Sequence, residues 1–116
     1  TVNIDRVRAM TFATVYPLYV AKVERKGQSV ESLNEVIRWL TGYSQAELDR
    51  LVTSGASLDE FFAGAPMNPN AELITGVICG VRVEQIDDPF MKKVRQMDKV
   101  VDEVANGRAM SKILRA

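Results

Sequence analysis

The sequence contains no histidine and only one cysteine among its 116 residues. Without an imidazole, the protein lacks both a common general base and a common zinc ligand. A single cysteine cannot form an intramolecular disulfide, so nothing indicates an oxidising compartment. No apolar run approaches the roughly 18 residues that a membrane span requires. These absences exclude imidazole-dependent catalysis and metal binding, and they predict a protein without a membrane segment.

An excess of charge of one sign is also missing, because 15 Lys and Arg residues balance 15 Asp and Glu residues. Proteins that bind nucleic acid or anionic membranes usually carry a basic excess, so we expect neither partner. The hydrophobic share of 47% and the charged share of 26% are ordinary for a globular protein. The length fits a single domain over residues 1–116.

The N-terminal stretch Thr1–Met10 mixes charges without a clear periodicity. It lacks the apolar segment of a signal peptide and the serine-rich composition of a transit peptide. Together with the absences above, this stretch predicts a cytoplasmic location and indicates no particular helix or strand.

Two helices are predicted in the first half of the chain. Thr14 is the predicted N-cap of the first, Pro17 falls in its first turn and Gly27 follows its end. Ser29 caps the second, and Gly42 ends it. Apolar side chains of the second helix repeat every three or four residues, as expected of a core-facing helix: Val30, Leu33, Val36, Ile37, Trp39 and Leu40.

Two capping boxes follow. Ser44 stands three residues before Glu47, and Ser57 stands three residues before Glu60. In this pattern the hydroxyl and the carboxylate each satisfy an otherwise unpaired backbone amide. The first box predicts a helix that ends at Gly55, and the second predicts a short helix after it.

A long helix is predicted near the C-terminus, with Asp88 as its N-cap, Pro89 in its first position and Gly107 after its end. A final turn covers Ala109–Leu114. The apolar positions of the long helix form a near-heptad stripe: Phe90, Val94, Met97, Val101 and Val104.

The width of this stripe predicts a homodimer. Met91 and Val100 extend the apolar surface beside it, and one helix in a small domain rarely buries so wide a face against its own chain. Charges beside the stripe would align a partner helix: Arg95, Asp98, Lys99, Asp102 and Glu103. We expect this helix or the turn Met110–Leu114 in the interface. The alternative is that the stripe forms the core of a monomer.

The segment Leu73–Val83 is ambiguous, because it is rich in β-branched residues that favour a buried strand. Asn70 as a cap, with Gly76 and Gly80 four residues apart, favours a short, closely packed helix. A lone strand would leave its backbone unpaired, so we predict a helix. The predicted fold class is therefore all-α, a compact bundle of about five or six short helices. The alternative is α+β, if Leu73–Val83 is a strand.

Three blocks of the sequence resemble a known family: Val15–Lys22, Val36–Ser44 and Leu73–Val83. They are similar to an uncharacterised prokaryotic family, the domain of unknown function numbered twenty-two hundred. The resemblance covers the chain from about Arg8 to Arg115. It implies a bacterial cytosolic protein made of one stand-alone domain. It implies no activity and transfers no functional residues.

Cys79 is the one conventional nucleophile in a suggestive setting, with Arg82 three residues further on. No histidine is present to act as its base, and a free cysteine in an apolar run is usually a small buried hydrophobe. We predict that Cys79 is buried and unreactive. The acidic pairs Asp59–Glu60 and Asp87–Asp88 are explained as helix starts. No catalytic residue, metal ligand or cofactor is therefore predicted.

Aromatic and basic residues of the kinds enriched at binding hot spots gather in the first two predicted helices and the turn after them. We take these, with one residue from the ambiguous segment, as candidate ligand-binding residues: Tyr16, Tyr19, Arg38, Trp39, Tyr43 and Arg82. The alternative is that the aromatic residues lie at the edge of the core with their polar tips in water.

The sequence favours a small cytosolic helical module that binds a ligand or another protein, without recognisable catalytic machinery. One alternative is an enzyme whose carboxylate, tyrosine or cysteine site is assembled from distant segments. A deep polar pocket holding Arg38, Tyr43 or Arg82 would favour it. The other is a helix-turn-helix nucleic-acid binder around Thr41–Ser44, which is disfavoured because Glu47 makes the start of its recognition helix acidic.

Overall fold

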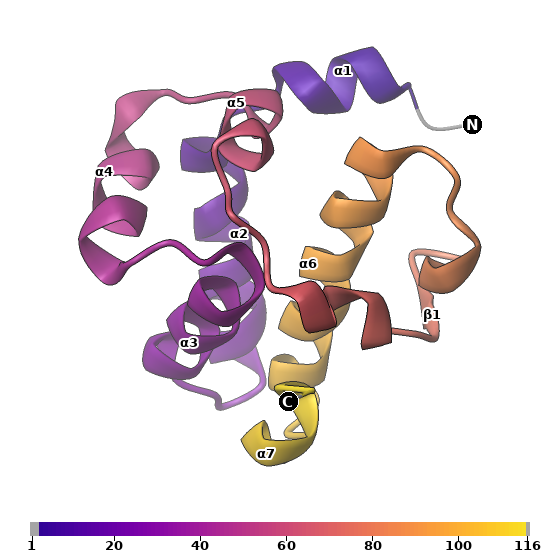
Figure 1. The fold of residues 1–116 in the computed structure, drawn as a ribbon. Coiled ribbons are helices and arrows are strands. Elements are labelled where there is room, and N and C mark those ends of the chain that lie inside the picture. The colour runs from indigo at the N-terminus through magenta and orange to yellow at the C-terminus, as the bar shows by residue number, and fades with distance from the viewer. Residues whose placement is uncertain (1–2, 116) are drawn as a thin grey trace.

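Helices are the main regular elements of the structure, a computed structural model that describes residues 3–115 (Figure 1). In chain order the elements are α1 (Ile4–Ala9), α2 (Phe12–Arg25), α3 (Val30–Thr41), α4 (Gln45–Ser54), α5 (Leu58–Ala63), the 3₁₀ helix η1 (Pro69–Leu73), β1 (Val77–Ile78), β2 (Val81–Arg82), the 3₁₀ helix η2 (Val83–Gln85), α6 (Pro89–Ala105) and α7 (Met110–Ile113). The predicted helical bundle is confirmed, with one small hairpin added to it.

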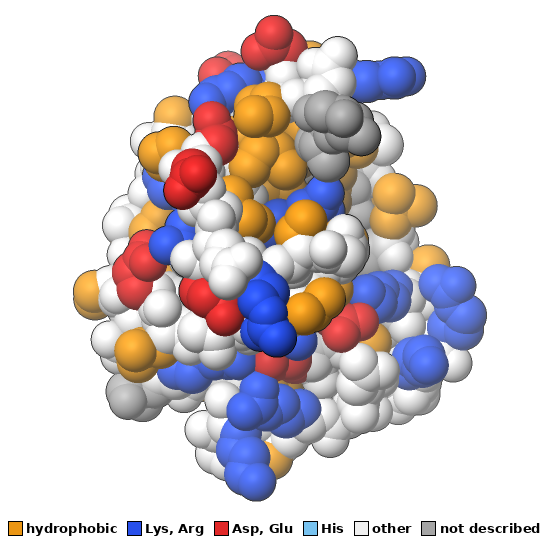
Figure 2. Space-filling view, turned by 90° about the vertical axis from the view of Figure 1, so that its right-hand side faces the viewer, with side chains coloured by type: hydrophobic (Ala, Val, Ile, Leu, Met, Phe, Trp, Pro, Cys, Tyr) orange, Lys and Arg blue, Asp and Glu red, His pale blue; other side chains and the backbone are white. Residues whose placement is uncertain are grey.

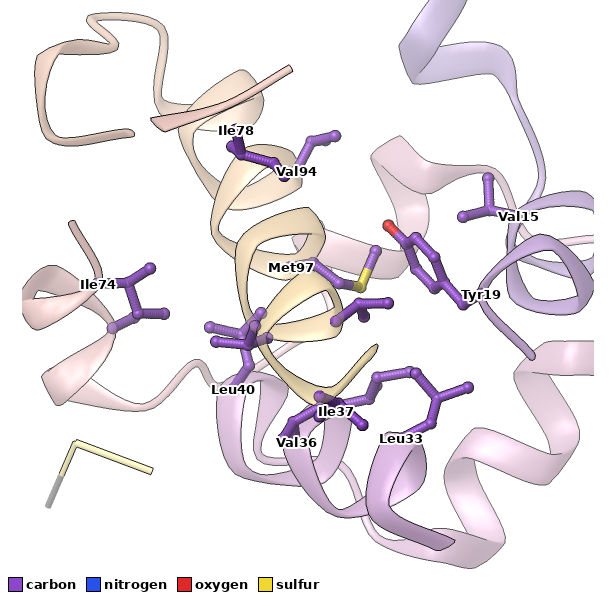
Figure 3. Packing of buried hydrophobic residues seen from close by; sticks show 14 of the residues in the cluster. Val15, Tyr19, Leu33, Val36, Ile37, Leu40, Ile74, Ile78, Val94 and Met97 are labelled. Carbon is purple, nitrogen blue, oxygen red and sulfur yellow. The ribbon is translucent and has the colours of Figure 1, made fainter. Parts of the chain in front are cut away.

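The core surrounds α6, which contacts α2, α3, α5, α7, β1 and η2. Ten of its 17 residues are buried. Side chains from α2, α3, α6 and β1 converge in the region drawn in Figure 3. The predicted start and end of this helix are confirmed, because the Asp88 side chain accepts from Met91 N and Gly107 follows the last turn with a φ of +77°.

The homodimer prediction assumes that Met91 and Val100 leave exposed apolar surface on α6, and this assumption is wrong. Met91 is 6% exposed and Val100 is 0% exposed, so the chain itself covers both side chains. The flanking charges also pair within the chain: Arg95 with Asp98 at 3.0 Å, and Lys22 with Asp102 at 3.0 Å. The stripe is therefore part of the chain's own core, because several elements each bury a part of it.

The predicted capping boxes are confirmed. In α4 the Ser44 hydroxyl accepts from Glu47 N, and a Glu47 carboxylate oxygen accepts from Ser44 N. Ser57 and Glu60 make the same pair of bonds at the start of α5. Ser29 caps α3 as predicted. These starts were readable because a cap and its partner lie within three residues of each other.

Helix α2 begins earlier than predicted. Thr11 is its N-cap and accepts from Thr14 N at 3.2 Å, so Thr14 lies inside the first turn. Pro17 is consequently the sixth residue of the helix, where it is exposed. A tertiary contact fixes this start, because Phe12 N donates to Ala56 O, which belongs to the loop before α5, at 3.0 Å.

The first helix, α1, was not predicted. Asn3 caps it by accepting from Arg6 N, and it packs on α5. With six residues it is too short to show a periodic pattern. Thr1 and Val2, the start of the stretch considered in the sequence, lie outside the described residues.

The predicted helix over Leu73–Val83 is wrong, because this segment contains a β-hairpin. Val77 pairs with Arg82 and Ile78 pairs with Val81 in antiparallel register. The two residues of the turn between the strands, Cys79 and Gly80, have φ angles of +52° and +78°. Positive φ at both central residues is typical of the type I′ turn, whose twist matches that of the strands. The strand is not left unpaired, because the segment folds back and supplies its own partner.

Cys79 is exposed at this turn, which corrects the prediction that it is buried. The segment Leu73–Val83 instead buries the side chains of Ile74, at 1% exposure, Ile78, at 9%, and Val83, at 0%. Cys79 occupies the turn beyond the paired residues Ile78 and Val81, which leaves its side chain at the surface.

A buried carboxylate holds the C-terminal segment. Glu103 is 6% exposed and accepts from Arg108 Nη1 at 2.6 Å. Arg115 donates to both of its oxygens, at 2.7 and 2.8 Å. Such bidentate pairs fix geometry as well as charge, and this one holds α7 against the end of α6.

The capping boxes predict a measurable loss of stability. Ser44→Ala and Ser57→Ala should each lower the free energy of unfolding by about 0.5–2 kcal/mol, because each leaves a helix-start amide without its acceptor. Urea unfolding measures the change. Ser111→Ala is the control, since Ser111 is exposed on α7 and caps no helix. Unchanged urea midpoints for both cap variants would contradict the boxes.

The position of Cys79 predicts that its thiol is accessible in the folded protein. Titration with a disulfide reagent should modify one thiol per chain under native conditions, at a rate close to that of the urea-unfolded chain. Modification that starts only on unfolding would mean that the hairpin turn faces the core instead.

Candidate functional site

The predicted ligand-binding residues Tyr16 and Arg38 lie on the side of the bundle made by α2, α3 and α4. Tyr16 Oη donates to Asn34 Oδ1 at 2.5 Å. Arg38 donates from Nη1 to Gln45 Oε1 at 2.5 Å and from Nη2 to Glu31 Oε1 at 3.1 Å. The polar atoms of both side chains are thus hydrogen-bonded within the protein. Tyr16 links α2 to α3, and Arg38 links α3 to α4.

The other predicted residues of this group are dispersed. Trp39 packs, partly buried, against the core. Tyr43 Oη donates to Phe61 O at 2.6 Å, which ties the turn after α3 to α5. Arg82 is exposed on the hairpin, 3.7 Å from a Glu84 carboxylate oxygen. In the described structure, Arg38, Tyr43 and Arg82 therefore lie apart, on α3, on the turn after it and on β2.

Tyr19 differs from the other candidates because it takes part in a partly buried polar link between two helices. It is 9% exposed, and its hydroxyl end points from α2 toward α6 (Figure 3). Tyr19 Oη donates to Asp98 Oδ1 at 2.5 Å, and Arg95 Nη1 donates to Asp98 Oδ2 at 3.0 Å. The three side chains thus form a chain of hydrogen bonds across the α2–α6 contact.

Burial raises the pKa of Tyr19 well above its ordinary value, and the negative charge of Asp98 raises it further. The Arg95 guanidinium has the opposite but smaller effect. At neutral pH the phenol is therefore protonated. It serves as a hydrogen-bond donor and not as a base or nucleophile.

An apolar groove opens beside Tyr19 between α1, α2 and α6. We call it the α1/α2/α6 groove. Its volume is about 230 Å³, and its lining is mostly aliphatic: Val7, Met10, Val15, Leu18, Tyr19, Leu58, Met91, Val94, Arg95 and Asp98. Figure 2 shows hydrophobic side chains gathered in a hollow near the top of the molecule, below α1. A cavity of about 150 Å³ is already large enough to bind benzene.

Two residues of the groove are exposed to an unusual degree for their type. Leu18 is 63% exposed and Met10 is 38% exposed. Both lie on α2 or at the junction before it, so they extend the apolar surface beyond the hollow itself. Large apolar side chains that gather at a concave site are typical of an interaction surface.

Of the residues that line the groove, the sequence singled out only Tyr19 as a ligand-binding candidate. Val7 and Met10 reach it through α1, a helix that carries no clear sequence signal. For Arg95 and Asp98 a sequence signal does exist, because oppositely charged residues three positions apart on a helix can form an ion pair. The structure pairs these two charges with each other, whereas the sequence pattern predicts that they align a partner helix.

Two further properties of residues 3–115 bear on function. No helix in this part of the chain is long and apolar enough to cross a membrane. The same residues contain no group of three or more Cys, Asp or Glu side chains placed to hold a metal ion.

The buried phenol predicts a pH dependence of stability. A raised pKa in the folded state means that the contribution of Tyr19 is complete below the ordinary value near 10 and is lost as the pH rises through the folded pKa. The free energy of unfolding should therefore fall above about pH 10, by up to about 1.4 kcal/mol per pH unit from this group.

Tyr19→Phe should make that fall shallower, because phenylalanine has no proton to lose. Urea unfolding between about pH 9 and pH 11 measures the effect. Tyr16→Phe is the matched control, since Tyr16 is less buried and its pKa is raised less. Parallel pH profiles for the wild type and Tyr19→Phe would contradict the predicted role of Tyr19.

The fold has a counterpart among solved structures. The crystal structure of "uncharacterized protein SP1917" is similar to this chain with a TM-score of 0.89 and 43% sequence identity. The similarity covers 94% of this chain and 90% of that one. A comparison with curated proteins gave no match.

The comparison with family models confirms the resemblance seen in the three sequence blocks. The matching model covers residues 6–115, which includes every residue that lines the α1/α2/α6 groove. The chain therefore belongs to the family described as "Uncharacterized protein conserved in bacteria", domain of unknown function 2200.

Proposed function

We propose that the protein is a small interaction module that binds an apolar side chain of a partner protein in the α1/α2/α6 groove. The observation that carries the proposal is Leu18, which is 63% exposed on the rim of an aliphatic hollow. Its exposure leaves apolar surface in water, and a partner would remove that surface from water.

The size of the groove supports a protein partner over a free small molecule. Its volume of about 230 Å³ lies below the 300–1,000 Å³ of typical ligand pockets. It exceeds the roughly 150 Å³ that holds benzene, so one aromatic or branched aliphatic side chain fits. A single anchor in a pocket with apolar surface around it is typical of a protein-binding hot spot.

The polar wall of the groove supports an apolar guest. Asp98 accepts from both Tyr19 and Arg95, so its two oxygens already have donors. A polar group of a ligand would have to compete with these bonds. The satisfied link instead fixes the wall and leaves the aliphatic side chains as the binding surface.

The two alternatives, an enzyme and a helix-turn-helix nucleic-acid binder, have less support in the structure. For an enzyme, the groove offers a protonated phenol and a carboxylate whose two oxygens already accept from Tyr19 and Arg95. For a helix-turn-helix, the start of α4 carries Glu47, whose carboxylate is bound to Ser44 N. A homodimer through the turn Met110–Leu114 stays a prediction, although Ile113 in that turn is buried.

Capped amino acids that imitate an anchor side chain test the proposal. N-acetyl amides of tryptophan, phenylalanine and leucine should shift the backbone amide resonances of Val7, Leu18 and Val94 in two-dimensional NMR spectra. N-acetyl glycinamide should leave them unchanged, because it has no side chain to bury. Absence of shifts with all three apolar probes would contradict the proposed site.

The variant that tests the groove is Leu18→Lys, which places a charge on its rim without changing the core. It should abolish the shifts, because an ammonium group resists burial by the probe. Leu73→Lys is the matched control, since Leu73 is 54% exposed and lies on η1, outside the groove. If both variants bind the capped amino acids equally well, the binding site lies outside the α1/α2/α6 groove.

A further inference from the structure

A second cavity lies on the opposite side of α6, between η1, the segment after η2 and the first turns of α6. We call it the η1/α6 cavity. Its volume of about 550 Å³ is within the 300–1,000 Å³ of typical ligand pockets. Met67 and Ile86 contribute apolar surface, and Asp87, Lys93 and Gln96 contribute polar groups.

Gln96 is the unusual residue of this cavity, because it is a polar side chain with only 2% exposure. Its Nε2 donates to Ala71 O at 3.2 Å, whereas no donor from residues 3–115 reaches its Oε1. Yet no fully buried side-chain nitrogen or oxygen of these residues is left without a partner. Oε1 therefore keeps a small accessible area, and Gln96 is one of the residues that line the cavity.

The charges of the cavity fall into two groups. Lys92 pairs with Glu72 at 2.9 Å, so these two balance each other. Glu84 accepts from Gly76 N at 3.0 Å, and Arg82 lies 3.7 Å from it. Both acidic residues are thus occupied within the chain.

Asp87 and Lys93 form the other group. Within the described part of the chain, neither is joined to an oppositely charged side chain, and they do not pair with each other. One cavity therefore presents a free carboxylate, a free ammonium group and a free amide oxygen. A ligand that carries both charges would satisfy all three.

We propose that the η1/α6 cavity binds a small zwitterion of the amino-acid class. The ligand ammonium group donates to Asp87 and to Gln96 Oε1, and the ligand carboxylate accepts from Lys93. The ligand side chain lies against Met67 and Ile86. The proposal is independent of the α1/α2/α6 groove, because the two sites share no lining residue.

NMR titration with the twenty free amino acids tests this site. At least one should shift the amide resonances of Asp87, Lys93 and Gln96 at millimolar concentration. For leucine, the matched analogues are 3-methylbutylamine, which lacks the carboxylate, and 4-methylpentanoate, which lacks the ammonium group. Each analogue should bind about tenfold more weakly or worse than the bound amino acid it matches, because it loses a charged hydrogen bond. If another amino acid binds best, its own decarboxylated and deaminated forms replace these two.

Substitutions in the cavity test which side chains bind the amino acid. Asp87→Asn and Lys93→Gln should each weaken binding about tenfold or more, because each removes one charge partner. Asp5→Asn and Lys112→Gln are the controls, since both residues are exposed and lie outside the cavity. Leu18→Lys should leave amino-acid binding unchanged, which separates this site from the proposed groove. Gln96→Leu adds a test of the amide, read only if its thermal unfolding remains cooperative.

Three outcomes would overturn the proposal. The first is that none of the twenty amino acids shifts the cavity resonances. The second is that the amine or the carboxylate analogue binds as tightly as its parent, which would indicate a site for a single charge. The third is that Asp87→Asn and Lys93→Gln both bind like the wild type.

Discussion

Helix α6 carries an apolar face that no single neighbour can cover, and the rest of the chain packs around it. Ten of its 17 residues are buried and all of them except Gln96 and Glu103 are apolar, so its apolar surface is wider than the stripe of an ordinary surface helix. Helices α2, α3, α5 and α7 and the hairpin each take a share of that surface. The stripe that suggested a second copy of the chain is thus satisfied within one copy.

The same constraint explains where the two candidate sites lie. Met91, Val94, Arg95 and Asp98 face the α1/α2/α6 groove, whereas Lys92, Lys93 and Gln96 face the η1/α6 cavity. Residues three or four apart share a face of a helix, so positions 91, 94, 95 and 98 lie on one side of α6 and positions 92, 93 and 96 lie on another. One helix therefore contributes to two separate hollows, each at a place where the covering elements do not meet.

The two hollows differ in how their polar groups are satisfied. In the groove, Tyr19, Asp98 and Arg95 bind one another, and burial keeps the phenol protonated. In the cavity, the Gln96 oxygen is free of donors from the described residues. Because the polar groups of the groove bind one another, only apolar surface is left there for a ligand. The unpaired polar groups of the cavity instead favour a ligand with complementary charges. The family match includes all of these positions, and the fold is shared with a protein of 43% identity.

The sequence by itself determined what depends on neighbours within one or two turns. Ser29, Ser44, Ser57 and Asp88 cap helices as predicted, because a cap bonds an amide only two or three residues away. The mostly helical class and the core stripe of α6 follow from the same local periodicity.

Only the tertiary structure decided what depends on distant contacts. The start of α2 moved to Thr11 because Phe12 bonds Ala56 across the chain. The hairpin replaced a predicted helix, and its turn carries Cys79 outward, because strand pairing there outweighs the helix signals. Tyr19 meets Asp98 across 79 positions of sequence, a pairing that no local pattern encodes. Side-chain chemistry was readable from the sequence, but which side chains share a site depended on how the helices pack around α6.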